Sequence, residues 1–130
     1  MNRIVLDASA LLAVLHDEPG AEIFNRQLDL LENAVVSAVN VAEAHGKLVA
    51  LGIAADDAWE AVIAPAHEIV VFDAQQARIV GGLQRQTRTI GLSLGDRACL
   101  ALGIVLKAPV YTADRAWKGL RLGMPIHVIR

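Results

Sequence analysis

The sequence is poor in cysteine and has no long uninterrupted apolar run. Cys99 is the only cysteine, so the chain cannot form a disulfide within itself. The first apolar stretch, Ile4–Leu6, meets Asp7 at once, and the run Ala10–Leu15 ends at His16. Both are shorter than the roughly 20 apolar residues of a membrane helix, and the first is unlike a secretory signal. These absences predict a cytoplasmic protein that does not enter the membrane.

Aromatic residues are also scarce, at 4% of the 130 residues, although 55% of the chain is hydrophobic. Small aliphatic side chains must therefore form most of the core, as expected for helices packed closely on a sheet. Charged residues make up 20% of the chain, which argues against a disordered or fibrous protein. The length fits one domain, residues 1–130, with enough chain to bury a core.

The net charge of −2 hides an uneven distribution of charge along the chain. Residues 1–68 carry three bases against eleven acids, whereas residues 69–130 carry nine bases against three acids. A chain polarised in this way can present a basic surface whatever its total charge, so a nucleic-acid partner is not excluded. The alternative is that folding mixes both halves over one surface.

Short apolar segments alternate with amphipathic ones along the whole chain. Strands are expected at Asn2–Leu6, Ala34–Val36, Glu68–Phe72, Pro109–Thr112 and Ile126–Ile129. Helices are expected at Ala8–Leu15, Ala21–Leu31, from the cap Ser37 to Leu51, at Ala55–Ala64, at Ala74–Arg88, and from the cap Ser93 to Leu106. This alternation predicts a three-layer α/β fold with a central, mostly parallel sheet flanked by helices.

Two carboxylates follow predicted strands directly. Asp7 comes after the first strand, and Asp114 comes shortly after the strand that ends at Thr112. Ligands of open α/β sheets bind at the carboxyl ends of the strands, so both acids are expected at one edge. Asp7, Asp96 and Asp114 also stand at predicted helix starts, where a carboxylate can simply cap free N–H groups. Ser93 and Asp96 even have the spacing of a capping box.

Two further acids stand on apolar helix faces. The residues that share a face with Glu43 are Val39, Ala42, Gly46 and Ala50. Asp96 heads an apolar stripe made of Cys99, Leu100 and Gly103. An unpaired carboxylate in such a place is costly, and the only helix neighbour able to pair with Glu43 is Lys47.

Acids gathered in one place need a cation. Two unit charges about 4 Å apart repel by about 4 kcal/mol in an effective dielectric of about 20. Oxygen ligands without cysteine or histidine partners favour Mg²⁺ or Mn²⁺ over zinc. The combined pattern predicts one acidic metal site formed by Asp7, Glu43, Asp96 and Asp114.

Four segments of the chain carry a specific resemblance. They read IVLDASA at residues 4–10, SAVNVAE at 37–43, GLSLGDRACLAL at 91–102 and VYTADRAW at 110–117. In order and spacing they resemble PIN-domain ribonucleases, specifically the VapC-type toxins of bacterial and archaeal toxin–antitoxin pairs. The resemblance implies a PIN-like fold and a Mg²⁺-dependent endoribonuclease that forms a homodimer and is silenced by a cognate antitoxin.

The same resemblance assigns the site residue by residue. The catalytic acids would be Asp7, Glu43, Asp96 and Asp114. The metal ligands among them would be Asp7, Asp96 and Asp114, and Ser9 and Thr112 match hydroxyl positions that support the carboxylates. Neither the number of metal ions nor the identity of the general base follows from the sequence.

A basic segment follows the last acid. Arg115, Lys118 and Arg121 come after Asp114 at intervals of three, and a helix would place them on one face. Such a face could bind the RNA backbone beside the acidic cluster. The alternative is a solvated helix face, because Gly119 weakens the helix prediction.

Other functions fit the same fold class less well. A signalling receiver domain binds Mg²⁺ through adjacent acids after its first strand, but Asp7 stands between Leu6 and Ala8. A haloacid-dehalogenase-type phosphatase needs Asp-x-Asp, whereas this chain has Asp7-Ala8-Ser9. A PIN-fold interaction module without catalysis would not need all four acids.

Overall fold

The computed structural model describes residues 2–130. The strands are β1 (Ile4–Leu6), β2 (Ala34–Ser37), β3 (Glu68–Val70), β4 (Val110–Thr112) and β5 (Ile126–Val128). The α-helices are α1 (Ala8–His16), α2 (Glu22–Arg26), α3 (Leu28–Glu32), α4 (Ala38–Ala50), α5 (Ala55–Ile63), α6 (Ala74–Gly82), α7 (Gln84–Thr87) and α8 (Leu94–Leu106). Two 3₁₀ helices, η1 (Arg88–Ile90) and η2 (Arg115–Gly119), complete the described secondary structure.

The strands form one sheet in the order β3-β2-β1-β4-β5, and every neighbouring pair is parallel. In the register, Val5 of β1 lies beside Val35 on one side and Val110 on the other. The chain therefore starts in the central strand, and the strand order reverses beside β1. The carboxyl end of β1 is thus the topological switch point at which sheets of this kind bind ligands.

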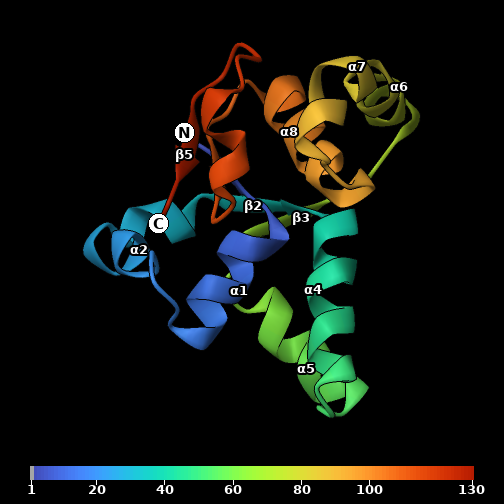
Figure 1. Ribbon diagram of the computed structural model, residues 1–130. Coiled ribbons are helices and arrows are strands. Elements are labelled where there is room, and N and C mark those ends of the chain that lie inside the picture. The colour runs from blue at the N-terminus through green and yellow to red at the C-terminus, as the bar shows by residue number, and fades with distance from the viewer. Residues whose placement is uncertain (1) are drawn as a thin grey trace.

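Alternating side chains of β1 pack in two separate hydrophobic cores. Ile4 and Leu6 belong to the core that includes residues of α1, α2, α4 and α5, whereas Val5 belongs to the core that includes residues of α8. Figure 1 shows α1 and α5 on one side of the sheet and α8 on the other. Helix α6 packs on the outside of α8. Each fully buried leucine such as Leu6 contributes roughly 1.5–3 kcal/mol of transfer free energy. The three-layer α/β architecture is as predicted, and the sheet is parallel throughout.

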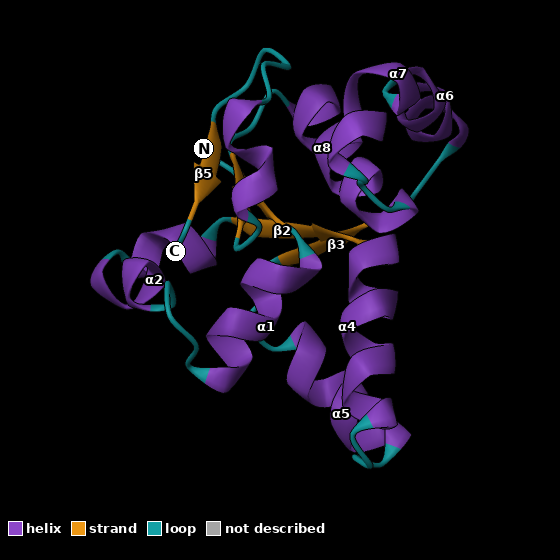
Figure 2. Cartoon of the chain, viewed as in Figure 1, coloured by secondary structure: helices purple, strands orange, loops and turns teal. Residues whose placement is uncertain are grey.

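Two predicted helices are divided in the structure (Figure 2). The segment Ala21–Leu31 breaks at Gln27, whose φ of −128° and ψ of 76° are not helical. The break lets α2 bury Phe24 against Tyr111, with ring centroids 5.6 Å apart. The segment Ala74–Arg88 likewise splits into α6, α7 and η1. No helix in residues 2–130 has both the length and the apolar character needed to cross a bilayer.

Candidate active site

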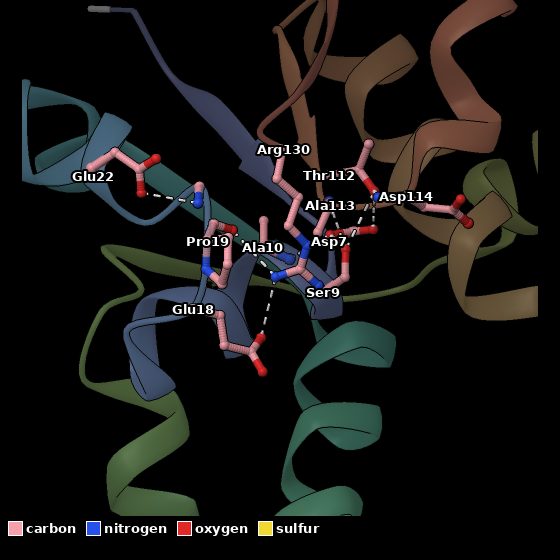
Figure 3. A network of polar contacts seen from close by, with 11 residues as sticks. Asp7, Ser9, Ala10, Glu18, Pro19, Glu22, Thr112, Ala113, Asp114 and Arg130 are labelled. Carbon is pink, nitrogen blue, oxygen red and sulfur yellow. Dashed lines mark hydrogen bonds and ion pairs between the residues drawn. The ribbon is translucent and has the colours of Figure 1, made fainter.

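Asp7 lies at the centre of a buried hydrogen-bond network at the end of β1 (Figure 3). It caps α1, because its Oδ1 accepts the Ala10 N–H at 2.8 Å. The Ser9 hydroxyl donates to the same oxygen at 2.7 Å, and the Thr112 hydroxyl donates to Oδ2 at 2.7 Å. Both hydroxyls expected to support the acids therefore contact Asp7, which is only 3% exposed.

The buried position makes Asp7 an unusually weak acid. Burial raises the pKa of Asp7 from 3.8 to about 6, and the negative charge of Asp96 adds to the rise. The hydrogen bonds from Ala10, Thr112 and Ser9 act in the opposite direction, because they stabilise the ionised form. Desolvation therefore outweighs three donors at this carboxyl group.

Thr112 and Ser9 connect Asp7 to the loop that follows β4. The Asp114 N–H donates to Thr112 Oγ1 at 3.0 Å, and the Ala113 N–H donates to Ser9 Oγ at 2.9 Å (Figure 3). Asp114 itself is exposed and caps η2, with its Oδ1 accepting the Ala116 N–H at 2.9 Å. The ends of β1 and β4 thus form one polar rim, as their place in a parallel sheet predicts.

Glu43 reaches this region from α4 and is held by Asn40. The Asn40 side-chain amide donates to Glu43 Oε1 at 2.9 Å and to the Gly95 carbonyl at 3.0 Å. A Cβ atom on Gly95 would collide with the Glu43 carboxylate, so glycine at this position lets that carboxylate lie against the start of α8. Asn40 is 1% exposed, and its Oδ1 has no hydrogen-bond partner among the described residues.

The surroundings of Glu43 differ from the apolar helix face on which the sequence pattern places it. Ala42, Gly46 and Ala50 are exposed, so the small-residue face looks outward, whereas Val41, Ala44 and Leu48 face the core. Glu43 lies between these faces and is half-buried. Among residues 2–130 it forms no ion pair with Lys47. Small residues are a poor guide to burial because their size suits either environment.

Asp96 begins α8 within a capping box. The Ser93 hydroxyl accepts the Asp96 N–H at 3.1 Å, and Asp96 Oδ2 accepts the Ser93 N–H at 3.0 Å. The following stripe of Cys99, Leu100 and Gly103 is buried, as expected. All three aspartates thus accept N–H groups at helix starts, and Asp7 and Asp114 also follow neighbouring strands at one edge of the sheet.

Three of the acids act electrostatically on the buried thiol of Cys99. Burial raises the pKa of the Cys99 thiol, and the charges of Asp7, Asp96 and Glu43 raise it further. As the side chains stand, no three Asp, Glu, His or Cys residues between positions 2 and 130 are arranged to hold one ion. Asp7, Asp96 and Asp114 instead accept hydrogen bonds from their own helix ends, and Glu43 accepts one from Asn40.

The residues nevertheless fit a hard divalent cation. The donors are carboxylate and hydroxyl oxygens, with the free Oδ1 of the buried Asn40 beside them. Oxygen-only donors suit Mg²⁺ or Mn²⁺ rather than a soft metal. Sequence reasoning missed Asn40 and Gly95, although a polar residue three positions before Glu43 on the same helix was a usable signal.

Only two of the three predicted basic residues lie on η2. Arg115 and Lys118 lie on this 3₁₀ helix, whose three residues per turn place them on one face. Both are exposed. Arg121 lies beyond the helix, and its guanidinium donates to the Leu120 carbonyl at 3.3 Å. The shared helical face therefore holds for two of the three residues.

The PIN domain family model matches residues 4–121, so the chain belongs to the PIN domain family. Two similar structures each cover 95% of this chain and 96% of their own, with a TM-score of 0.72: VapBC2 from Rickettsia felis bound to promoter DNA, at 17% identity, and FitAcB from Neisseria gonorrhoeae, at 20%. VapBC-5 from Mycobacterium tuberculosis covers 100% of this chain and 99% of its own, at 20% identity and a TM-score of 0.60. No curated protein matched the sequence. At these identities the likeness establishes the fold.

Proposed function

We propose that this protein is a Mg²⁺-dependent endoribonuclease, formed by one PIN domain and acting in the cytoplasm as the toxin of a toxin–antitoxin pair. The observation that carries the proposal is the buried Asp7 carboxyl, whose pKa is raised to about 6 beside Asp96. A carboxylate kept at such a place despite its cost is typical of a functional site. The charges of Asp7, Asp96 and Glu43 all raise the pKa of the same buried thiol, Cys99, and the Asp114 N–H donates to Thr112, which supports the proposal.

The chain's own residues would hold and orient the reacting groups. When bound, a divalent cation such as Mg²⁺ or Mn²⁺ would lower the pKa of a water molecule and offset charge on the phosphate. Asp7, Asp96 and Asp114 are the proposed metal ligands, and Glu43 completes the acidic set. Ser9 and Thr112 fix both oxygens of Asp7, and Asn40 fixes Glu43. Asp114, exposed at the rim, stands where substrate would enter.

The proposed partners rest on family relationships. VapBC-5 is described as a member of a family of toxin–antitoxin systems, and another similar structure is a toxin–antitoxin complex from Klebsiella pneumoniae, at 13% identity and a TM-score of 0.70. By analogy, we propose a cognate antitoxin and a homodimer for this chain. The RNA substrate follows from the nuclease proposal.

The test is cleavage of a mixed pool of structured RNAs with Mg²⁺, with Mn²⁺ and with EDTA. We expect metal-dependent cleavage by the wild type, and at least a hundredfold loss in Asp7→Asn. Asp73→Asn is the matched control, because Asp73 caps α6 through the same bond, from the Gln76 N–H at 2.9 Å, but lies elsewhere. Cleavage without metal, or equal loss in both variants, would refute the proposed site.

A further inference from the structure

A hollow of about 850 Å³ lies beside the acidic rim, between α2, β5 and η2. This volume falls in the range of small-ligand sites and is large enough for a nucleotide. Three cationic side chains line it, those of Arg115, Lys118 and Arg130, and none of the described lining residues is an acid. It adjoins the candidate active site, because Arg115 directly follows Asp114.

An aromatic pair forms one wall of the hollow. Tyr111 and His127 lie opposite each other in the register of β4 and β5, and their rings stack with centroids 4.7 Å apart and planes 30° apart. Tyr111 is supported from behind by Phe24, whereas the His127 side chain is exposed. The hollow therefore offers a flat ring, backed by two further rings, on which a base can stack.

The cations are arranged between this wall and the acidic site. Lys118 is exposed and forms no ion pair within residues 2–130. Arg115 Nε donates to the main-chain oxygen of Arg130 at 3.1 Å. The Arg130 guanidinium donates to the Pro19 carbonyl at 3.2 Å and lines a second hollow of about 280 Å³ that Ser9 also lines (Figure 3). Arg130 also forms an ion pair with Glu18 at 3.6 Å, and Glu18 lines the second hollow, so the charge of Arg130 is already neutralised on the side of Ser9.

We infer that the large hollow binds one unpaired nucleotide of the substrate RNA, with its base on His127 and its phosphate against Lys118 and Arg115. The inference rests on the proposed function for the identity of the substrate, and it adds where a nucleotide next to the cleavage site lies. A stacking wall beside the exposed ammonium group of Lys118, in a hollow that no described Asp or Glu side chain lines, complements a base and its phosphate. A bound protein segment would complement this hollow only if it carried both an aromatic and an acidic residue.

Binding of two single-stranded probes to the full chain tests the inference. The first is a fluorescein-labelled adenosine 12-mer RNA, and the second is an abasic ribose-phosphate strand of the same length. Fluorescence anisotropy is measured with Mg²⁺ across a salt series, in an Asp7→Asn background that prevents cleavage. The variants are His127→Ala, His127→Phe and Lys118→Gln. Arg85→Gln is the matched control for the removal of an exposed charge, because Arg85 lies on α7, away from this hollow.

We expect His127→Ala to weaken binding of the adenosine strand about tenfold while leaving the abasic strand unchanged, because one stacked base is worth roughly 1–3 kcal/mol. His127→Phe should restore the affinity, since the stacking surface remains. Lys118→Gln should weaken both probes and lower the salt slope by about 0.7, the value for one phosphate contact. Equal effects of His127→Ala on both probes, or an effect of Arg85→Gln in place of Lys118→Gln, would overturn the inference. These outcomes are independent of wild-type cleavage, so failure of the proposed nuclease activity remains distinguishable.

Discussion

At the scale of single residues, Asp7 combines two roles that have opposite effects on stability. Its cap on α1 and its bonds to two hydroxyls stabilise the fold, whereas its charge is held in a buried place. A pKa raised from 3.8 to about 6 corresponds to a cost of about 3 kcal/mol at neutral pH. A bound cation would offset this cost, which links stability, pH and metal at one side chain.

The pH dependence of folding tests this link. Because the pKa of Asp7 is higher in the folded than in the unfolded chain, stability from this group is fully present below pH 3.8 and lost as pH rises through 6. In EDTA, Asp7→Asn should therefore be more stable than the wild type at pH 7.5, and this advantage should shrink as pH falls from 6 to 4. Urea denaturation measures it, with Asp73→Asn as the control for cap loss.

Adding Mg²⁺ to the same urea denaturation experiment gives a second test. Mg²⁺ should stabilise the wild type by mass action and leave Asp7→Asn unchanged. An advantage of Asp7→Asn that stays constant from pH 7.5 to pH 4 would show that the ionisation of Asp7 is not its cause. Equal stabilisation of both proteins by Mg²⁺ would place the cation elsewhere.

At the scale of elements, the site depends on how closely α4 approaches α8. Gly95→Ala would push the Glu43 carboxylate aside, and the unfolding free energy should change by less than about 1 kcal/mol because only the end of a flexible side chain moves. We expect cleavage to fall at least tenfold. Gly46→Ala is the matched control, since a Cβ there meets nothing within 4 Å. It should keep full activity and gain about 0.5–1 kcal/mol. Full activity in Gly95→Ala would show that cleavage does not depend on the position of the Glu43 carboxylate.

Much of this arrangement could be predicted from local sequence. All five strands occur where apolar runs predicted them, and Ser37 and Ser93 cap α4 and α8 as expected. The break at Gln27 could not be predicted, because neither glycine nor proline marks it and the burial of Phe24 on a distant strand decides it. Local patterns thus predict the elements, and packing between them decides where they divide.

The candidate site could likewise be predicted only in part from local sequence. The placement of Asp7 and Asp114 follows from strand ends in a parallel sheet, which sequence periodicity reveals. The contact of Asn40 with Gly95 joins residues of two helices that are 55 positions apart in sequence. No pattern within one helix predicts such a contact, because the relative position of α4 and α8 is a tertiary property.

At the scale of the whole molecule, apolar side chains remain exposed around the turn between α4 and α5. They are Val49, Leu51, Ile53 and Trp59. Exposed apolar patches often mark partner sites, so we predict that a second copy of the chain covers this one. We expect sedimentation equilibrium to show twice the mass of one chain at tens of micromolar, roughly the range of a weak dimer, and dissociation on dilution. A strict monomer at the higher concentration would contradict the dimer.

The central position of β1 also has a consequence for synthesis of the protein. The strand made first must pair with β4, and Thr112 reaches Asp7 across 105 positions of the chain. Contacts between such distant residues form slowly, and a nascent chain leaves the ribosome from its N-terminus. Until β4 has emerged, Asp7 has only the local bonds from Ala10 and Ser9. The proposed nuclease site therefore cannot assemble on a half-made chain, and we expect a nascent chain to be unable to cleave RNA until β4 has left the ribosome.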